Sequence, residues 1–304
     1  MFPLLNLPLL PLEIIMRRMD PFELINFSML SNRCTTAAER AKRKVDEVEW
    51  YFNDLERIIK VKTPNCWHPT TIEFHANPRN PRITMFDVKH GCEKYSDIWI
   101  VSKSVNMLDT LEKLSAHILK IFKAKELNLK VENVHPSLPN FWDGLNLNFH
   151  SVYFSSMNGT IDANSRSMMF ILENIKTDQL TLWFRQFSRT FQYSKPLKHK
   201  TLCIQCGRWI TLDNLLNMEC EDLTIVRSHI TTEELYVFFD KWKEGGFPKL
   251  KKLFLAYPIG YRWDLIINDT DEDGNPILTD VNGNRGTFEH YNNIYIEFRV
   301  NFQT

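Results

Sequence analysis

Short strands with an apolar–x–apolar pattern recur along most of this chain and constrain its fold more than any other feature. Seven such pairs are present: Ile98 with Ile100, Leu127 with Leu129, Val152 with Phe154, Leu180 with Leu182, Leu202 with Ile204, Leu223 with Ile225, and Leu253 with Leu255. Successive pairs begin 21 to 30 residues apart, which leaves room for one strand and one helix or turn in each interval. The sequence therefore predicts an α/β fold.

The segments between these strands have the periodicity of helices. Residues 109–122 place apolar side chains three and four positions apart, and residues 211–218 begin with a threonine that can cap a helix. Residues 231–246 give the clearest pattern, because Thr231 and Glu234 can form a capping box before an apolar stripe. Strand, helix and strand joined by short links predict right-handed crossovers and parallel strands.

We expect these units to stack over residues 98–304 as an irregular leucine-rich-repeat-like solenoid, with an ordinary α/β sheet as the alternative. Near the carboxyl end Ile294, Ile296, Phe298 and Val300 alternate strictly with other residues. This alternation predicts an antiparallel C-terminal hairpin that closes the open edge of the sheet.

The run at residues 7–33 is dense in apolar residues but is interrupted by charges such as Glu13, Arg17 and Asp20. These charges exclude a secretory signal, and no window of roughly 20 residues is free enough of charge to span a membrane. We therefore expect a soluble protein with no membrane partner. Six cysteines without a signal sequence indicate an intracellular protein, cytoplasmic or nuclear.

The same run predicts three short helices. Asp20 can cap the second helix, with Pro21 at its first position and Glu23 closing a capping box. The first helix would place Leu7, Leu12, Ile15 and Met19 on one apolar face. The third would start after Ser31 or Asn32 and run to Lys44. Three helices in about 40 residues cannot bury their own apolar surface, so they must pack against the rest of the chain or a partner.

This segment resembles an F-box, and the nematode version in particular. The matching residues are Leu7–Pro8, Ile15–Met16, Met19–Asp20–Pro21, Leu24, Phe27–Ser28 and Leu30–Ser31, whereas Leu10 and Cys34 depart from the common pattern. The resemblance implies docking on the Skp-type adaptor of SCF ubiquitin ligases and, through it, on cullin. The adaptor-binding residues that it implies are Leu7, Pro8, Leu12, Ile15, Leu24, Phe27 and Leu30.

A second resemblance covers residues 180–300. The stretches "TLDNLLNMECEDLTI" and "TTEELYVFFDKWKEGGFPKLKKLFL" are similar to the type 2 F-box-associated domain of nematode receptors. This resemblance implies capture of a protein substrate for ubiquitylation, without identifying the substrate. We expect an F-box at residues 1–44, a connecting segment at 45–97 and a substrate-recognition domain at 98–304.

Within the connecting segment, residues 45–62 fit a helix or a strand, and the pattern leaves both open. Residues 70–76 and 82–88 alternate around "NPRNP" and predict a hairpin.

The residue between the two apolar members of each strand pair should point to the opposite face of the sheet. The residues on this face are Trp99, Asn128, Tyr153, Thr181, Trp183, Cys203, Gln205, Thr224 and Phe254. Large aromatic residues on an accessible surface commonly supply binding energy between proteins. We expect substrate to bind through Tyr153, Thr181, Trp183, Gln205 and Thr224.

The other patterns in the sequence favour no catalytic or cofactor chemistry. A net charge of +0 argues against a nucleic-acid partner, and we interpret the basic residues 39–44 as a solvated helix face. Cys203 and Cys206 lack a second pair at zinc-finger spacing, and residues 269–280 imitate a calcium loop but fit a hairpin turn better. We expect no metal and no enzyme activity; the rival hypotheses are a scaffold without a ubiquitin link and an enzyme acting on a small molecule.

Overall fold

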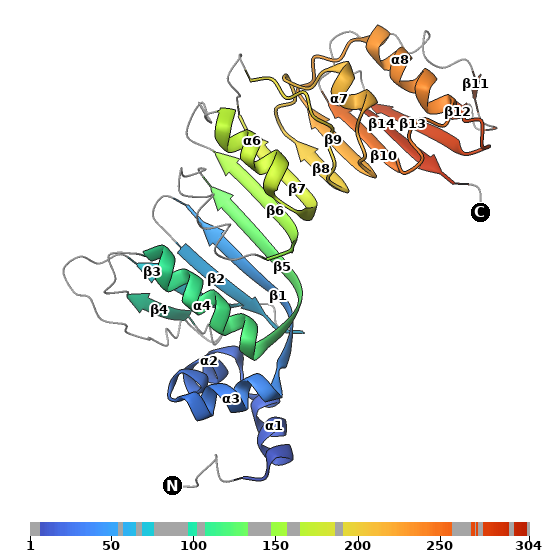
Figure 1. Cartoon of the computed structure of the whole chain (residues 1–304). Helices are drawn as coiled ribbons and strands as arrows, with labels where there is room; N and C mark the ends of the chain where they lie inside the picture. The colour runs from blue at the N-terminus through green and yellow to red at the C-terminus, as the bar shows by residue number, and fades with distance from the viewer. Residues whose placement is uncertain are drawn as a thin grey trace. The chain divides into compact units, whose positions relative to one another are not determined.

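In the computed structural model the chain forms two compact units, residues 1–150 and 151–304 (Figure 1). The described residues are 7–53, 57–64, 69–75, 97–101, 107–132, 147–156, 165–185, 191–256, 269–270, 272, 276–291 and 295–302. Within this described part, no helix is long and apolar enough to cross a membrane.

The first unit begins with three short helices, as predicted. They are α1 (Leu9–Arg18), α2 (Pro21–Met29) and α3 (Asn32–Ala41). The capping box at the start of α2 is confirmed, because Asp20 accepts from the backbone N–H of Glu23 at 2.8 Å. The third helix ends at Ala41, not at Lys44, because Lys42 adopts a left-handed conformation with φ of 42°.

A sheet and one long helix follow in the first unit. The strands are β1 (Arg43–Phe52), β2 (Arg57–Lys62), β3 (Thr70–His75), β4 (Asp97–Val101) and β5 (Phe122–Glu132), and the helix is α4 (Met107–Ile121). Residues 45–52 and 57–62 therefore belong to two antiparallel strands, and for these residues the helix alternative is wrong. The strand at 70–75 is confirmed, whereas residues 82–88 lie outside the described residues.

The order of strands in the first unit is β5-β1-β2-β3-β4. Stacking of the strand–helix units over residues 98–304 would place the strand at Ile98 beside the strand at Leu127, and this consequence of the expected stacking is wrong. The strand β4 pairs with β3, while β5 pairs in parallel with β1. The pattern at 98–100 is that of a buried strand, but an apolar pattern does not encode which strand is its neighbour.

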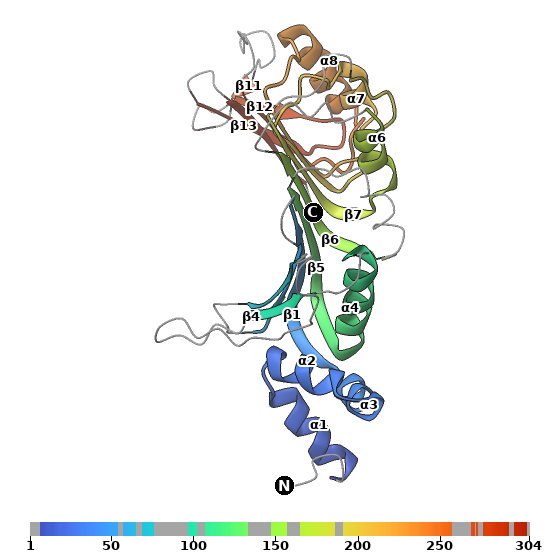
Figure 2. The ribbon, with the colours of Figure 1, turned by 90° about the vertical axis from the view of Figure 1, so that its left-hand side faces the viewer.

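Helix α4 covers one face of this sheet (Figure 2). On that face the indole N–H of the fully buried Trp50 donates to the hydroxyl of Ser115 at 2.8 Å, and this hydroxyl donates to the carbonyl of Leu111. Each buried polar group in this chain of hydrogen bonds therefore has a partner, which fixes how α4 sits on β1.

The second unit contains most of the predicted strand–helix units. Its elements up to residue 256 are β6 (Phe149–Ser156), α6 (Ser165–Asn174), β7 (Thr177–Phe184), β8 (Thr201–Ile204), α7 (Leu212–Leu216), β9 (Asp222–Val226), α8 (Thr232–Lys243) and β10 (Lys252–Ala256). The strands β7, β8, β9 and β10 are parallel neighbours, as the alternation of strands and helices predicts. Helices α6, α7 and α8 lie on one face of this sheet (Figure 2).

Helix α8 confirms its sequence signals in detail. Thr231 and Glu234 form the predicted capping box, and Gly245 ends the helix with φ of 82°. The expected apolar stripe, Leu235, Phe238, Phe239 and Trp242, is buried. The ring of Phe239 lies 5.0 Å from that of Phe298, so the helix packs on the C-terminal strands.

Four antiparallel strands complete the second unit. They are β11 (Asp269–Thr270), β12 (Pro276–Thr279), β13 (Arg285–Tyr291) and β14 (Tyr295–Asn301), and β14 pairs with β10. The strands β11 and β12 pair in antiparallel fashion, which agrees with the strand pairing that a hairpin at residues 269–280 requires. Asp280 accepts from the backbone N–H groups of Asn282 and Asn284, each at 2.8 Å, so its carboxylate stabilises the next turn.

Candidate functional site

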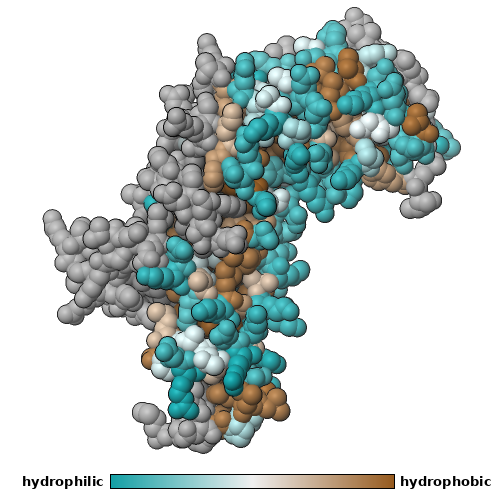
Figure 3. Space-filling model, in the orientation of Figure 1, coloured by the Kyte–Doolittle hydropathy of each residue, from teal (hydrophilic) through white to brown (hydrophobic). Residues whose placement is uncertain are grey.

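Apolar side chains are exposed on the two N-terminal helices. Six of the twelve large hydrophobic side chains that are exposed in the described residues fall within α1, α2 and the residue after α2. They are Leu9, Leu10, Ile14, Ile15, Met29 and Leu30, with Leu10 at 69% and Leu30 at 76% exposure. Hydrophobic side chains gather over α1 in the space-filling view (Figure 3). Such a concentration on a small module is typical of a protein-binding surface.

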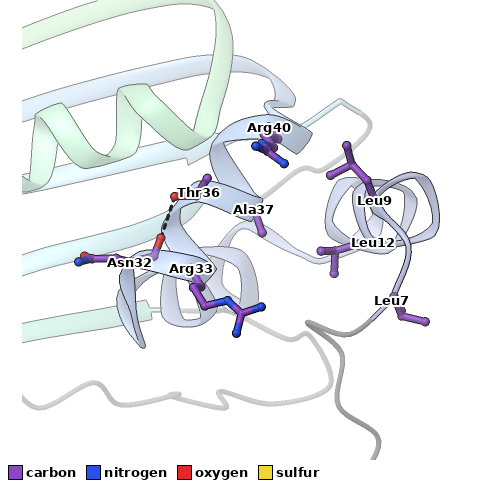
Figure 4. A pocket seen from close by; sticks show the side chains of 8 residues that line it. All are labelled: Leu7, Leu9, Leu12, Asn32, Arg33, Thr36, Ala37 and Arg40. Carbon is purple, nitrogen blue, oxygen red and sulfur yellow. Dashed lines mark hydrogen bonds between the residues drawn. The ribbon is translucent and has the colours of Figure 1, made fainter.

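A hollow of about 440 Å³ lies beside these exposed residues, between α1 and α3. Leu7, Leu9 and Leu12 line one side, and residues of α3 line the other: Asn32, Arg33, Thr36, Ala37 and Arg40 (Figure 4). The hydroxyl of Thr36 donates back to the carbonyl of Asn32 at 2.9 Å. The hollow thus has an apolar wall opposite a polar, basic wall, which suits an amphipathic segment of a partner.

The residues implied by the F-box resemblance fall into three groups by exposure. Leu12 and Leu24 are buried and hold the three helices together, while Leu7 and Phe27 are half-buried. Pro8, Ile15 and Leu30 are exposed and open to a partner. The expected apolar face of α1 needs correction, because Met16 is fully buried while Ile15 is 37% exposed.

Sequence reasoning overlooked Leu9, Leu10, Ile14 and Met29 as exposed apolar positions. The available signal was that α1 is apolar around most of its circumference, so α3 can cover only one side of it.

The three N-terminal helices are attached to the rest of the first unit through α4. Helices α2 and α3 pack against α4. The hydroxyl of Ser28 in α2 donates to the carbonyl of Ile25 at 2.7 Å and lies 2.8 Å from Nε2 of His117 in α4. Because the single hydroxyl proton of Ser28 is used by Ile25, Nε2 of His117 donates to Ser28. A partner bound to these helices is therefore held against a fixed scaffold.

Burial, reinforced by the charge of Lys120, lowers the pKa of His117 below its usual 6.5. The unfolded chain then takes up a proton at this histidine before the folded chain does, so the free energy of unfolding falls as pH drops through about 6.5. We expect thermal unfolding of the wild type to shift to lower temperature between pH 7.5 and 5.5. The same shift should be smaller in His117→Gln, which retains a donor without a titratable ring; an unchanged shift would contradict this role.

The sheet face opposite the helices of the second unit carries aligned accessible side chains. One row crosses the strands through Thr181, Cys203, Thr224 and Phe254, which are direct register partners. A parallel row contains Thr201, Asp222, Lys252 and Arg299. The first row is uncharged from Thr181 to Phe254 and meets Glu297 on β14, whereas the second row carries the charges of Asp222, Lys252 and Arg299.

Charged residues at the β14 side of this face neutralise one another. Burial raises the pKa of Glu297, but hydrogen bonds from Lys252 and Arg299 outweigh that effect and hold its pKa below the usual range. The ring of Phe254 stacks on Tyr295 at 5.3 Å between centroids. Phe254 is thus partly covered by its own sheet, whereas Trp183 is 40% exposed.

The predicted face assignment holds for the residues whose side chains are described. Tyr153, Thr181, Gln205 and Thr224 are half-buried and Trp183 is exposed, while their apolar neighbours along each strand are buried. The side chain of Trp99 lies outside the described residues. Asn128 belongs to the first unit, where its amide donates to Glu47 at 2.6 Å.

The four cysteines among the described residues are free thiols, and three of them are buried. Cys206 and Cys220 are buried but lie outside strands, and Cys203 on β8 is half-buried. Burial, then the charges of Glu219 and Asp222, raises the pKa of Cys220 to about 12. Among the described residues no three His, Cys, Asp or Glu side chains are grouped for a metal ion.

Comparison with known protein families gives one match in each of the two units. The model of the F-box domain matches residues 4–46, and that of the F-box associated family matches residues 190–255, which span β8 to β10. An uncharacterized protein of Caenorhabditis elegans is 20% identical over 275 residues, covering 88% of this chain and 77% of the relative. No solved structure gives a significant match. Together with the three helices and the sheet described above, these matches confirm the two resemblances seen in the sequence: the chain carries an F-box domain at residues 4–46 and an F-box associated region at residues 190–255, and it is similar to a nematode protein.

Proposed function

We propose that this chain is the substrate receptor of an SCF-type ubiquitin ligase. The observation that carries the proposal is the set of exposed apolar side chains on α1 and α2, within the segment that matches the F-box domain. In this role the F-box docks on a Skp-type adaptor and, through it, on cullin. The chain supplies binding surfaces, and catalysis belongs to other subunits.

The adaptor contact would involve the predicted residues in three ways. Pro8, Ile15 and Leu30 are open to direct contact, and Leu9 and Leu10 extend the same apolar surface. Leu7 and Leu12 would form the wall against which an inserted adaptor segment packs. Leu24 and Phe27 would act chiefly by holding the helices together. Burying one such exposed side chain contributes roughly 1.5–3 kcal/mol.

The second unit would hold the protein substrate. The F-box associated match covers β8, β9 and β10, whose open face carries Gln205 and Thr224 beside Thr181 and Trp183. We propose that substrate lies across this face, with Tyr153 and Trp183 as aromatic anchors. The irregular leucine-rich-repeat-like stacking belongs to the same proposal, since stacked strands present such a face continuously.

A binding experiment with purified proteins tests the adaptor contact. Leu30→Asp replaces an exposed apolar side chain with a charge, so we expect at least about tenfold weaker capture of a purified Skp-type adaptor. Val281→Asp makes the same kind of change at an exposed position of the second unit and should leave capture intact.

Equal capture by the wild type and Leu30→Asp would remove the basis for the adaptor contact. No capture even by the wild type would favour the alternative, a scaffold or interaction module without a ubiquitin link. The open sheet face supports that alternative equally well, because binding a partner does not require ubiquitylation.

A further inference from the structure

The first unit contains a second hollow whose lining is almost entirely cationic. It has a volume of about 480 Å³ and lies where α3 ends and β1 begins. The six residues around it are Arg17, Arg40, Ala41, Lys42, Arg43 and Lys44. This described lining thus brings together five positive charges and no carboxylate.

The backbone explains why these charges gather. Lys42 ends α3 in a left-handed conformation, and the chain turns directly into β1. On β1, Lys44 lies opposite Lys123 of the parallel strand β5, which adds a further cation at the base of the same strand. The interpretation of residues 39–44 as a solvated helix face therefore needs correction, because α3 ends at Ala41 and the next three residues line the hollow.

One residue of the lining is already fixed in place. The Nε–H of Arg17 donates to the carbonyl of Ala41 at 3.0 Å, and its terminal nitrogen lies 3.3 Å from Glu13. Lys42 and Lys44 are exposed. Positive charges that line the same hollow repel one another, and an anion in the hollow would relieve that repulsion.

We propose that this hollow docks an acidic segment of a partner protein, with side-chain oxyanions as the recognised group. Guanidinium groups pair with carboxylate and phosphoryl oxygens through strong charge-assisted hydrogen bonds. A phosphoryl group brings a charge of about −1.5 to −2, and a glutamate brings one negative charge. This proposal does not depend on the ubiquitin-ligase role.

The size of the site favours a protein segment over a nucleic acid. A nucleic acid binds through many phosphates along an extended basic track, and a chain with net charge +0 is a poor candidate for such a track. The cations here surround one compact hollow, which matches a few anionic side chains.

The test measures fluorescence anisotropy with the full chain. The probes are a short fluorescein-labelled glutamate-rich peptide with one phosphoserine, the same peptide with serine, and a labelled single-stranded RNA of similar charge. We expect Lys42→Glu/Lys44→Glu to weaken peptide binding at least about tenfold. Lys200→Glu/Lys249→Glu, the same charge change at exposed positions of the second unit, should have little effect.

The result decides both the site and the source of the oxyanion. Tighter binding of the phosphoserine peptide assigns a phosphoryl group, and equal binding of the two peptides assigns carboxylates. Equal losses in the two double variants, or no loss in either, would overturn the proposal, as would RNA binding that is tighter than peptide binding and lost in Lys42→Glu/Lys44→Glu. The neutral variant Lys42→Gln/Lys44→Gln should give an intermediate loss at unchanged thermal stability, which separates lost charge from misfolding.

Discussion

Leu24→Asp should destabilise the N-terminal helices more than any exposed substitution on them. The side chain of Leu24 is 0% exposed, and it lies at the centre of α2. A carboxylate at this position would have to ionise without solvent or remain protonated in an apolar site, and either costs about 4 kcal/mol or more. We expect chemical denaturation, followed by circular dichroism, to show an early loss of helix.

Leu30→Asp is the matched control for this prediction. It makes the identical chemical change one turn and a half further on, at a side chain that is 76% exposed. Its stability should therefore remain within about 0.5 kcal/mol of the wild type. Equal destabilisation by the two variants would contradict the division of the F-box residues into packing and contact positions.

Tyr153→Ala/Trp183→Ala should abolish substrate recognition without loss of the fold. Both side chains lie on the open face of the second unit, and anchoring aromatics contribute about 2 kcal/mol or more each in favourable cases. We therefore expect at least about 100-fold weaker substrate binding, read as loss of ubiquitylation of the co-purifying protein in a reconstituted ligase.

Tyr236→Ala provides the control for that double variant. Tyr236 is an aromatic residue of α8 that is 47% exposed, on the face that carries the helices. Removing it should leave ubiquitylation and thermal stability close to those of the wild type. A collapse in the stability of Tyr153→Ala/Trp183→Ala would instead place these side chains in the core and the substrate surface elsewhere.

Local chemistry predicted individual elements well. Asp20 with Glu23, and Thr231 with Glu234, form the expected capping boxes, because a cap involves residues only three positions apart. The alternation of apolar residues also identified the strands β6 to β10 and their faces, since side-chain direction along a strand has a fixed period of two, whereas it left β1 and β2 undecided between strand and helix.

The same local patterns do not determine which strands become neighbours in the sheet. The strand β4 pairs with β3, and β1 pairs with β5 across 79 residues of sequence, yet all of these strands are similarly apolar. The exposure of Ile14 was missed for a related reason: α1 is apolar on several sides, and only the position of α3 decides which side is covered. The basic hollow likewise depends on one left-handed residue, Lys42.

Calorimetric titration of the full chain with a purified Skp-type adaptor tests whether the exposed apolar surface of α1 and α2 binds the adaptor. We expect one-to-one binding with a dissociation constant of about 1 µM or tighter, which corresponds to about −8 kcal/mol. It also predicts a negative heat-capacity change, because the exposed apolar side chains of α1 and α2 become buried. The absence of heat, together with no association in a second assay such as gel filtration, would contradict the assignment of this surface to the adaptor.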